Sequence, residues 1–132
     1  AASNNRLNML AELQSAALIA KLESSQATAL PAESALELAT INGARALGME
    51  QVIGSLEIGK DADMLASELR EPHTQPLNNV ISQLVYATGG HEVSHSWVRG
   101  RPLVQNREVI GLDVAGVIER AHHWSTQLAA RG

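Results

Sequence analysis

The sequence contains no cysteine and no phenylalanine, and its only aromatic residues are Tyr86, Trp97 and Trp124. The absence of cysteine excludes disulfides, thiolate catalysis and cysteine-ligated zinc, and it favours a reducing compartment such as the cytoplasm. The absence of phenylalanine means that the core must consist of Ala, Leu, Val and Ile. With 10 Lys plus Arg against 14 Asp plus Glu, the chain lacks the basic face that nucleic-acid binding requires. No apolar run reaches the roughly 18 residues of a membrane span. We therefore expect neither a nucleic-acid nor a membrane partner.

The start of the sequence also lacks two features. Position 1 is Ala rather than an initiator Met, and no basic-then-apolar signal segment precedes Leu7. Two interpretations are open at this point: a mature protein cut after a signal, and a chain that begins inside a larger protein.

The first third of the sequence predicts helices. Apolar residues recur at spacings of three and four over 7–22, on an arc wide enough for a helix buried on more than one side. Asn4 or Asn5 is predicted to cap this helix, because an Asx side chain accepts hydrogen bonds from the free amides of a first turn. Pro31 predicts the start of a second, interrupted helical stretch that ends at Gly48.

Beyond Gly48 the pattern changes to short extended pieces separated by glycines. Alternation of apolar and polar residues predicts strands at 62–69, 92–99, 102–104 and 108–110. The last three form a small antiparallel meander. Residues 80–86 fit either a short helix or a strand, and Asp113 is predicted to cap a last helix.

The histidines do not form a metal site in the sequence. His91 and His95 are four residues apart on an extended segment, which separates them by about 13 Å and prevents them from sharing a metal. His122 and His123 diverge by about 100° on the last helix, and one of them is placed beside Trp124 at a packing surface.

The remaining polar motifs have ordinary structural interpretations. Asp61 and Asp63, beside Lys60, are interpreted as the solvated start of a strand rather than as a cation site, and His73 is interpreted as a solvated loop residue. Gly54–Ser55 is a turn, and the glycines match neither a dinucleotide-binding motif nor a P-loop. We therefore predict no catalytic residue and no metal ligand in this sequence.

Two stretches carry a longer ordered pattern. Residues 39–48, ATINGARALG, run into residues 53–64, IGSLEIGKDADM. This order and spacing resemble the A-T-x-N-G/P-A-x-x-L-G … G-S-L-x-x-G-K-x-A-D signature of the amidohydrolase superfamily. The opening AASNN and the stretches 82–86 and 93–101 are similar to a narrower branch, the 5-methylthioadenosine/S-adenosylhomocysteine deaminases and their chlorohydrolase relatives. The likeness covers essentially the whole chain.

The resemblance implies an α/β fold and an incomplete one. In this family a metal-dependent (β/α)8 barrel carries the chemistry, and a small composite β-sandwich is built from both ends of the chain. A whole barrel needs about 200 residues or more. We therefore expect a C-terminal portion, with the last barrel helices at 1–48, sandwich strands at 49–112 and a closing C-terminal helix at 113–132. Its exposed apolar surface predicts docking onto the upstream barrel portion, or self-association as a homo-oligomer.

The resemblance also implies an activity for the parent protein. This is the hydrolytic deamination of 5′-methylthioadenosine, S-adenosylhomocysteine or a similar purine nucleoside, with zinc or another divalent metal lowering the pKa of a bound water. The family's metal ligands fall upstream of Ala1, so this chain alone is expected to hold no cofactor and to be inactive. Ser3, Asn4 and Asn5 would follow the eighth barrel strand, and they are the positions placed near substrate. The alternative for Asn4 and Asn5 is a helix cap and nothing more.

Two other functions remain open. Another ring hydrolase or deaminase of the family, acting on triazines, guanine or cytosine, fits the same signature, because the pocket residues that separate these enzymes lie mostly upstream. An alternative of a different class is an autonomous β-rich binding or assembly module that shares the family's tail.

Overall fold

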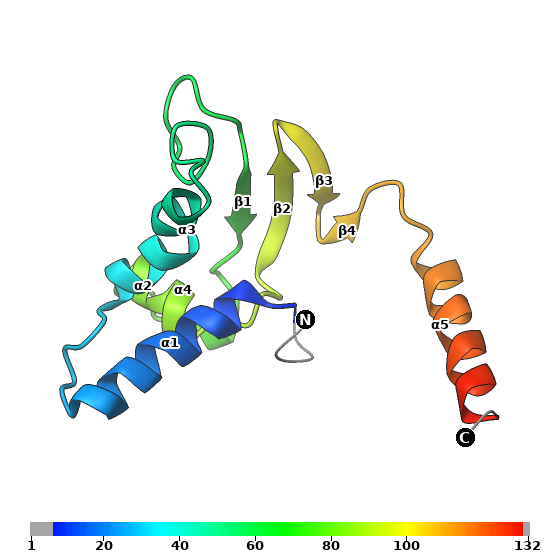
Figure 1. Cartoon of the computed structure of the whole chain (residues 1–132), viewed down its shortest axis with the longest axis horizontal. Coiled ribbons are helices and arrows are strands. Elements are labelled where there is room, and N and C mark those ends of the chain that lie inside the picture. The colour runs from blue at the N-terminus through cyan, green and yellow to red at the C-terminus, as the bar shows by residue number, and fades with distance from the viewer. Residues whose placement is uncertain (1–6, 131–132) are drawn as a thin grey trace.

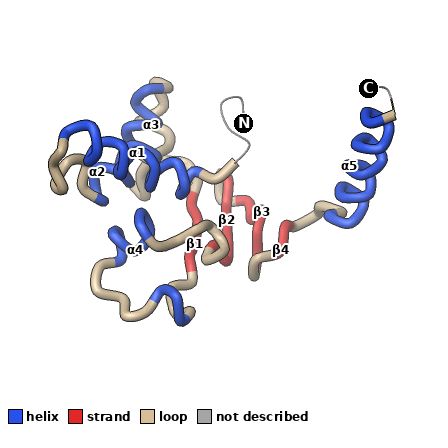
Figure 2. Tube along the Cα trace, turned by 90° about the horizontal axis from the view of Figure 1, so that it is seen from below, coloured by secondary structure: helices blue, strands red, loops and turns tan. Residues whose placement is uncertain are grey.

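The computed structural model describes residues 7–130. Helices come first in the chain, the strands of one sheet follow with a 3-10 helix and an α-helix inserted after the first strand, and one helix comes last (Figure 1). Figures 1 and 2 show α1 to α4 gathered at one end of the molecule, whereas α5 stands apart at the other end, beyond β4. The elements are α1 Met9–Ser24, α2 Ala32–Ala39, α3 Ile41–Ala46, β1 Met64–Ser67, the 3-10 helix η1 Pro72–Thr74, α4 Val80–Tyr86, β2 Val93–Val98, β3 Arg101–Gln105, β4 Glu108–Val109 and α5 Val114–Ala129.

Helix α1 begins later than predicted. Its cap is Asn8, whose Oδ1 accepts a hydrogen bond from the amide of Ala11 at 3.2 Å. The prediction of a cap at Asn4 or Asn5 is therefore wrong. The physical reason is a tertiary contact, because the Asn8 side chain also donates from Nδ2 to the carbonyl oxygen of Gly89 at 2.7 Å. Nothing in the local sequence indicates that partner.

Helices α1, α2 and α4 enclose the hydrophobic core. Its buried members are aliphatic and mostly small: Leu13, Ala17, Ala32, Ala35 and Val85. Ala17 and Ala35 are completely buried, and side chains of this size let neighbouring helices approach closely. Of the expected Ala, Leu, Val and Ile, the first three supply the buried core, and Ile81 packs against it partly buried.

The helix boundaries in this part follow ordinary capping chemistry. The stretch at 80–86, open between helix and strand in the sequence, is helix α4. Asn79 caps it, since its side chain accepts from the amide of Ser82 at 2.8 Å. Gly48 ends the earlier helical stretch with a φ of +67°, the left-handed conformation that the sequence predicts.

The four strands form one antiparallel sheet in the order β1-β2-β3-β4. Each of the four predicted strands is present, with ends shifted by up to two residues. Met64 pairs with Trp97 between β1 and β2, and Val104 pairs with Val109 between β3 and β4. The first strand therefore joins the predicted meander along the edge of β2. Together with the helices, the sheet confirms the mixed α/β class.

Helix α5 packs against nothing in the part of the chain that the structure describes. Asp113 caps it as predicted, accepting from the amide of Gly116 at 2.9 Å, but none of its residues is buried. Trp124 is 59% exposed, and its ring meets the neighbouring His123 ring in a T-shaped arrangement with 6.3 Å between centroids. The predicted packing surface beside Trp124 is therefore absent within residues 7–130. No described helix is both long and apolar enough to span a membrane.

Candidate functional site

The described chain begins two residues after the segment predicted to lie near substrate. Ser3, Asn4 and Asn5, here called the substrate loop, lie outside the described residues, and their role stays a prediction. The described chain begins beside an open hollow of about 470 Å³ between the start of α1 and the turn that follows α4. It is lined by Leu7, Asn8, Ala11, Gln14, Thr88, Gly89 and His91.

The cap residue of α1 and one side chain of the helix hold the walls of this hollow together. Asn8 donates to the carbonyl oxygen of Gly89 at 2.7 Å, and Gln14 donates from Nε2 to the carbonyl oxygen of Tyr86 at 2.7 Å. Both contacts join segments more than 70 residues apart in the chain. The start of α1 is therefore fixed to the connection between α4 and β2.

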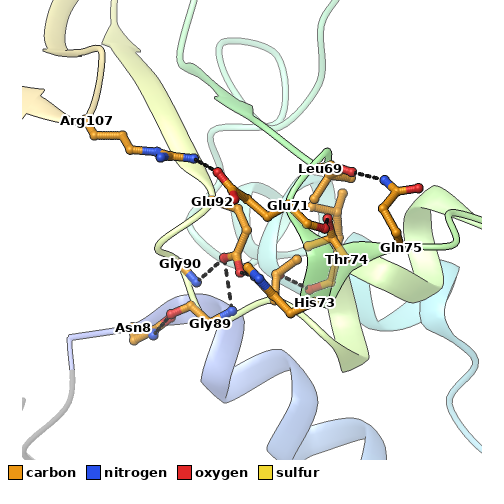
Figure 3. A network of polar contacts seen from close by, with 12 residues as sticks. Asn8, Leu69, Glu71, His73, Thr74, Gln75, Gly89, Gly90, Glu92 and Arg107 are labelled. Carbon is orange, nitrogen blue, oxygen red and sulfur yellow. Dashed lines mark hydrogen bonds and ion pairs between the residues drawn. The ribbon is translucent and has the colours of Figure 1, made fainter.

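A buried carboxylate organises this connection (Figure 3). The Glu92 side chain is 4% exposed, and its Oε2 accepts from the amides of Gly89 at 3.1 Å and Gly90 at 3.0 Å. Its Oε1 lies 2.9 Å from Nε2 of His73. Burial raises the pKa of Glu92, but hydrogen bonds from His73 and from the backbone amides outweigh it and hold the pKa below the ordinary value. The carboxylate is thus kept charged inside the fold.

The burial of Glu92 and its hydrogen bonds to this turn were not predicted from the sequence. The only signal is the motif G-G-x-E, in which two consecutive glycine amides precede a carboxylate. The interpretation of His73 as a solvated residue is wrong in one respect, since its ring is 58% exposed but has a carboxylate partner. That partner lies 19 residues away, so no local pattern reports it.

We expect Glu92→Gln to destabilise the protein at neutral pH and to flatten the acid side of its stability profile. A group whose folded pKa is lowered stabilises the fold fully above its ordinary value, here 4.5, and loses that contribution as the pH falls through the folded pKa. The neutral-pH loss should be about 1.5–3 kcal/mol, the usual value of hydrogen bonds to a charged group. Urea unfolding at a series of pH values measures it. The exposed Glu108→Gln is the control, and an equal response of the two variants would contradict the expectation.

The two aspartates of the signature hold a turn. Asp63 accepts from the backbone amide of Arg99 at 2.7 Å, and Asp61 accepts from the Arg99 side chain at 3.0 Å. Lys60 instead donates to Ser55 at 2.6 Å and pairs with Glu57 at 3.2 Å. The interpretation as the solvated start of a strand is therefore incomplete, because this pair fixes the turn between β2 and β3.

The signature glycine at position 54 has a steric role. Gly54 has a φ of +95°, and a Cβ placed on it would lie 2.7 Å from Cβ of Ala44 and 3.0 Å from Cα of Ile41. The loop before β1 therefore packs directly against α3. This contact brings the two halves of the signature together in the fold.

The described residues do not fit a metal. Across residues 7–130, no three His, Asp or Glu side chains gather as ligands. His95 stacks on Trp97 with ring centroids 5.6 Å apart, and its Nδ1 lies 3.0 Å from Oγ of Ser94. His91 lines the hollow described above. We assign no reaction step to a metal on these residues.

Comparison with known proteins identifies the family. The model of the Amidohydrolase family matches residues 1–103. The chain belongs to this family. The resemblance found in the sequence is thereby confirmed.

Similar proteins of known sequence include deaminases of adenine nucleosides. A 5-methylthioadenosine/S-adenosylhomocysteine deaminase of Teredinibacter turnerae is 47% identical over 131 residues, which are 99% of this chain and 30% of the relative. A 5′-deoxyadenosine deaminase of Methanosarcina acetivorans is 43% identical over 98% of this chain and 30% of its own. The chain thus spans about 30% of the length of these curated relatives.

Two solved structures are also similar to this chain. A zinc-bound adenosine deaminase of Xanthomonas campestris superposes with a TM-score of 0.94 and 44% identity, over 98% of this chain and 29% of its own. A triazine hydrolase variant superposes with a TM-score of 0.78 at 24% identity over 86% of this chain and 25% of its own. The second likeness shows a shared fold only.

Proposed function

We propose that this chain is the C-terminal portion of a metal-dependent hydrolytic deaminase of adenine nucleosides modified at the 5′ position. The observation that carries the proposal is the agreement with the zinc-bound adenosine deaminase over 98% of the chain. The names of the relatives support the substrate class, since 5′-methylthioadenosine, S-adenosylhomocysteine and 5′-deoxyadenosine all lack a free 5′-hydroxyl. The match to an enzyme family over residues 1–103 argues against the autonomous binding module.

The proposal assigns a part to each segment. Residues 1–48 supply the last barrel helices, 49–112 supply sandwich strands and 113–132 supply the closing helix. Exposed apolar side chains on α1 support the first assignment, because they need a further layer to cover them. They are Met9, Leu18, Ile19 and Leu22. Helix α5 also exposes large apolar side chains, which support a contact with the upstream portion or a second copy: Val114, Val117, Ile118, Trp124 and Leu128.

The metal belongs to the remainder of the protein in this proposal. A divalent ion such as zinc is supported by the zinc-bound relative, and its ligands are expected outside residues 7–130. What this chain supplies is the substrate loop and the body that carries it. Ser3, Asn4 and Asn5 are proposed to contact the nucleoside.

Substrate comparison on the full-length protein tests the function. We expect 5′-methylthioadenosine, S-adenosylhomocysteine and 5′-deoxyadenosine to be deaminated with a kcat/KM at least about tenfold above that for guanine, cytosine or a chlorotriazine, a difference of about 1.4 kcal/mol in transition-state binding. The fall in adenine absorbance and the release of ammonia measure it. The reverse order would favour a nucleobase or triazine hydrolase of the same family.

Asn4→Ala and Asn5→Ala test the substrate loop in the full-length enzyme. Because Asn8 caps α1, neither residue is needed as its cap, and a loss on substitution would report contact with substrate. We expect kcat/KM to fall by about tenfold or more, at roughly 1.4 kcal/mol per decade. The control is Asn79→Ala, which removes the cap of α4 at a cost of about 1 kcal/mol in stability. Unchanged kcat/KM in both loop variants would remove these residues from the site.

A further inference from the structure

We propose that α5 is a docking helix whose apolar side packs against the upstream portion of the same polypeptide, the part that precedes residue 1. This inference rests on the proposed function in one respect, since it takes the chain to be the C-terminal portion of a longer enzyme. The upstream portion, and not a second copy of the protein, is the partner that covers α5.

The large apolar side chains of α5 lie along one side of the helix. At about 100° per residue they fall within an arc of about 120°, the width that is typical of a helix face turned toward a core. Glu119 and His123 lie on the opposite side of the helix. Each of the large apolar side chains is at least 40% exposed within residues 7–130. This set, here called the α5 stripe, consists of Val114, Val117, Ile118, Trp124 and Leu128.

The position of α5 is shared with a solved enzyme. Figures 1 and 2 show α5 beyond β4 and apart from α1 to α4. The zinc-bound adenosine deaminase superposes over 98% of this chain with a TM-score of 0.94, and α5 supplies 16 of the 132 residues. A displaced α5 would leave those 16 residues unmatched and lower the score. The helix therefore keeps its place in a protein of which this chain covers only 29%, so its separation from α1 to α4 is compatible with the presence of the remaining chain.

The size of the α5 stripe favours a partner within the same polypeptide. A stable interface between separate proteins buries about 800 Å² and about 20–30 residues on each side. A helix of 16 residues is about 24 Å long, and this one presents a single narrow stripe. That is too little for a second copy, whose binding must also overcome the loss of translational and rotational freedom. A partner in the same polypeptide avoids that cost, because the connecting chain keeps its effective concentration high.

The upstream portion also has the length that this role requires. The chain spans about 30% of the curated relatives, so the remainder is more than twice as long as this chain. A second apolar surface lies on α1, where Leu18 and Ile19 are more than half exposed. Figure 1 places α1 and α5 at opposite ends of the molecule. One large upstream portion can cover both surfaces, whereas a second copy bound at α5 would leave α1 uncovered.

Hydrogen exchange in the full-length enzyme tests the docking with Ile118→Ala. Alanine is the best helix former, so an undocked α5 should exchange its amides at 118–129 no faster in the variant than in the wild type. If Ile118 is buried against the upstream portion, its truncation should instead accelerate exchange by about tenfold or more. His123→Ala, on the opposite side of the same helix, is the matched control and should accelerate nothing. Acceleration that spreads from α5 to β2 would also support burial of Ile118, because truncation of an exposed side chain does not destabilise a whole fold.

Sedimentation velocity of the wild type, Ile118→Ala and the stronger variant Ile118→Asp identifies the partner. We expect one mass for all three, because the covering surface belongs to the same polypeptide. A smaller mass in either variant would assign the α5 stripe to a second copy and overturn the proposal. Unchanged or slower exchange in Ile118→Ala would overturn the docking itself, as would equal acceleration in His123→Ala. A wild-type enzyme inactive on adenine nucleosides would refute the proposed function instead, since neither measurement depends on that activity.

Discussion

The 132-residue chain alone is expected to release no ammonia from 5′-methylthioadenosine, even with zinc added. Residues 7–130 bring no three potential metal ligands together, and the sequence predicts no catalytic residue in the chain. Relative to the full enzyme, turnover should drop by at least about 10⁶-fold, the lower range of enzymatic rate enhancements. Absorbance of the adenine ring and an ammonia assay measure the difference.

Complementation provides the control for this experiment. Co-expression with the upstream portion as a separate polypeptide should restore turnover, because the exposed apolar residues of α1 offer a surface on which it can dock. The same co-expression with a Leu18→Asp, Ile19→Asp chain should restore much less, since both side chains are more than half exposed and belong to that surface. Turnover by the 132-residue chain on its own would contradict the assignment as a partial enzyme.

The order of elements could be predicted from the sequence because each element has a local signal. The three-and-four spacing of apolar residues predicts α1, alternation predicts β2, and Asp113 marks the start of α5. Gly48 marks a helix end because few other residues tolerate its positive φ. These signals depend on neighbours within one or two turns, and the structure confirms them.

The contacts that build the candidate site could not be predicted in the same way. Asn8 meets Gly89 across 81 residues, and Asp63 meets Arg99 across 36. In the sequence Glu92 is an ordinary polar residue at the start of a strand, and only the fold shows that it is buried beside two free amides. The family pattern includes both Asp63 and Arg99, but it does not predict that they contact each other. A motif records which residues recur and not what they touch.

Substitution of Gly54 can measure how much the backbone conformation and the packing against α3 each contribute to the need for glycine at this position. We expect Gly54→Ala to destabilise the full-length protein by about 2–5 kcal/mol. About 1–2 kcal/mol of this comes from placing a Cβ at a φ of +95°, and about 1–3 kcal/mol from overpacking against α3. Urea unfolding followed by circular dichroism measures the loss.

Gly59 is the matched control, because it has nearly the same backbone angle without the close neighbours. Its φ is +97°, and a Cβ placed there would meet nothing within 4 Å. Gly59→Ala should therefore show the conformational cost alone, about 1–2 kcal/mol. The difference between the two variants isolates the contact of Gly54 with Ala44 and Ile41. Equal losses would mean that both glycines of the signature serve only their turns, and that the packing of the loop on α3 contributes nothing to the requirement for glycine at position 54.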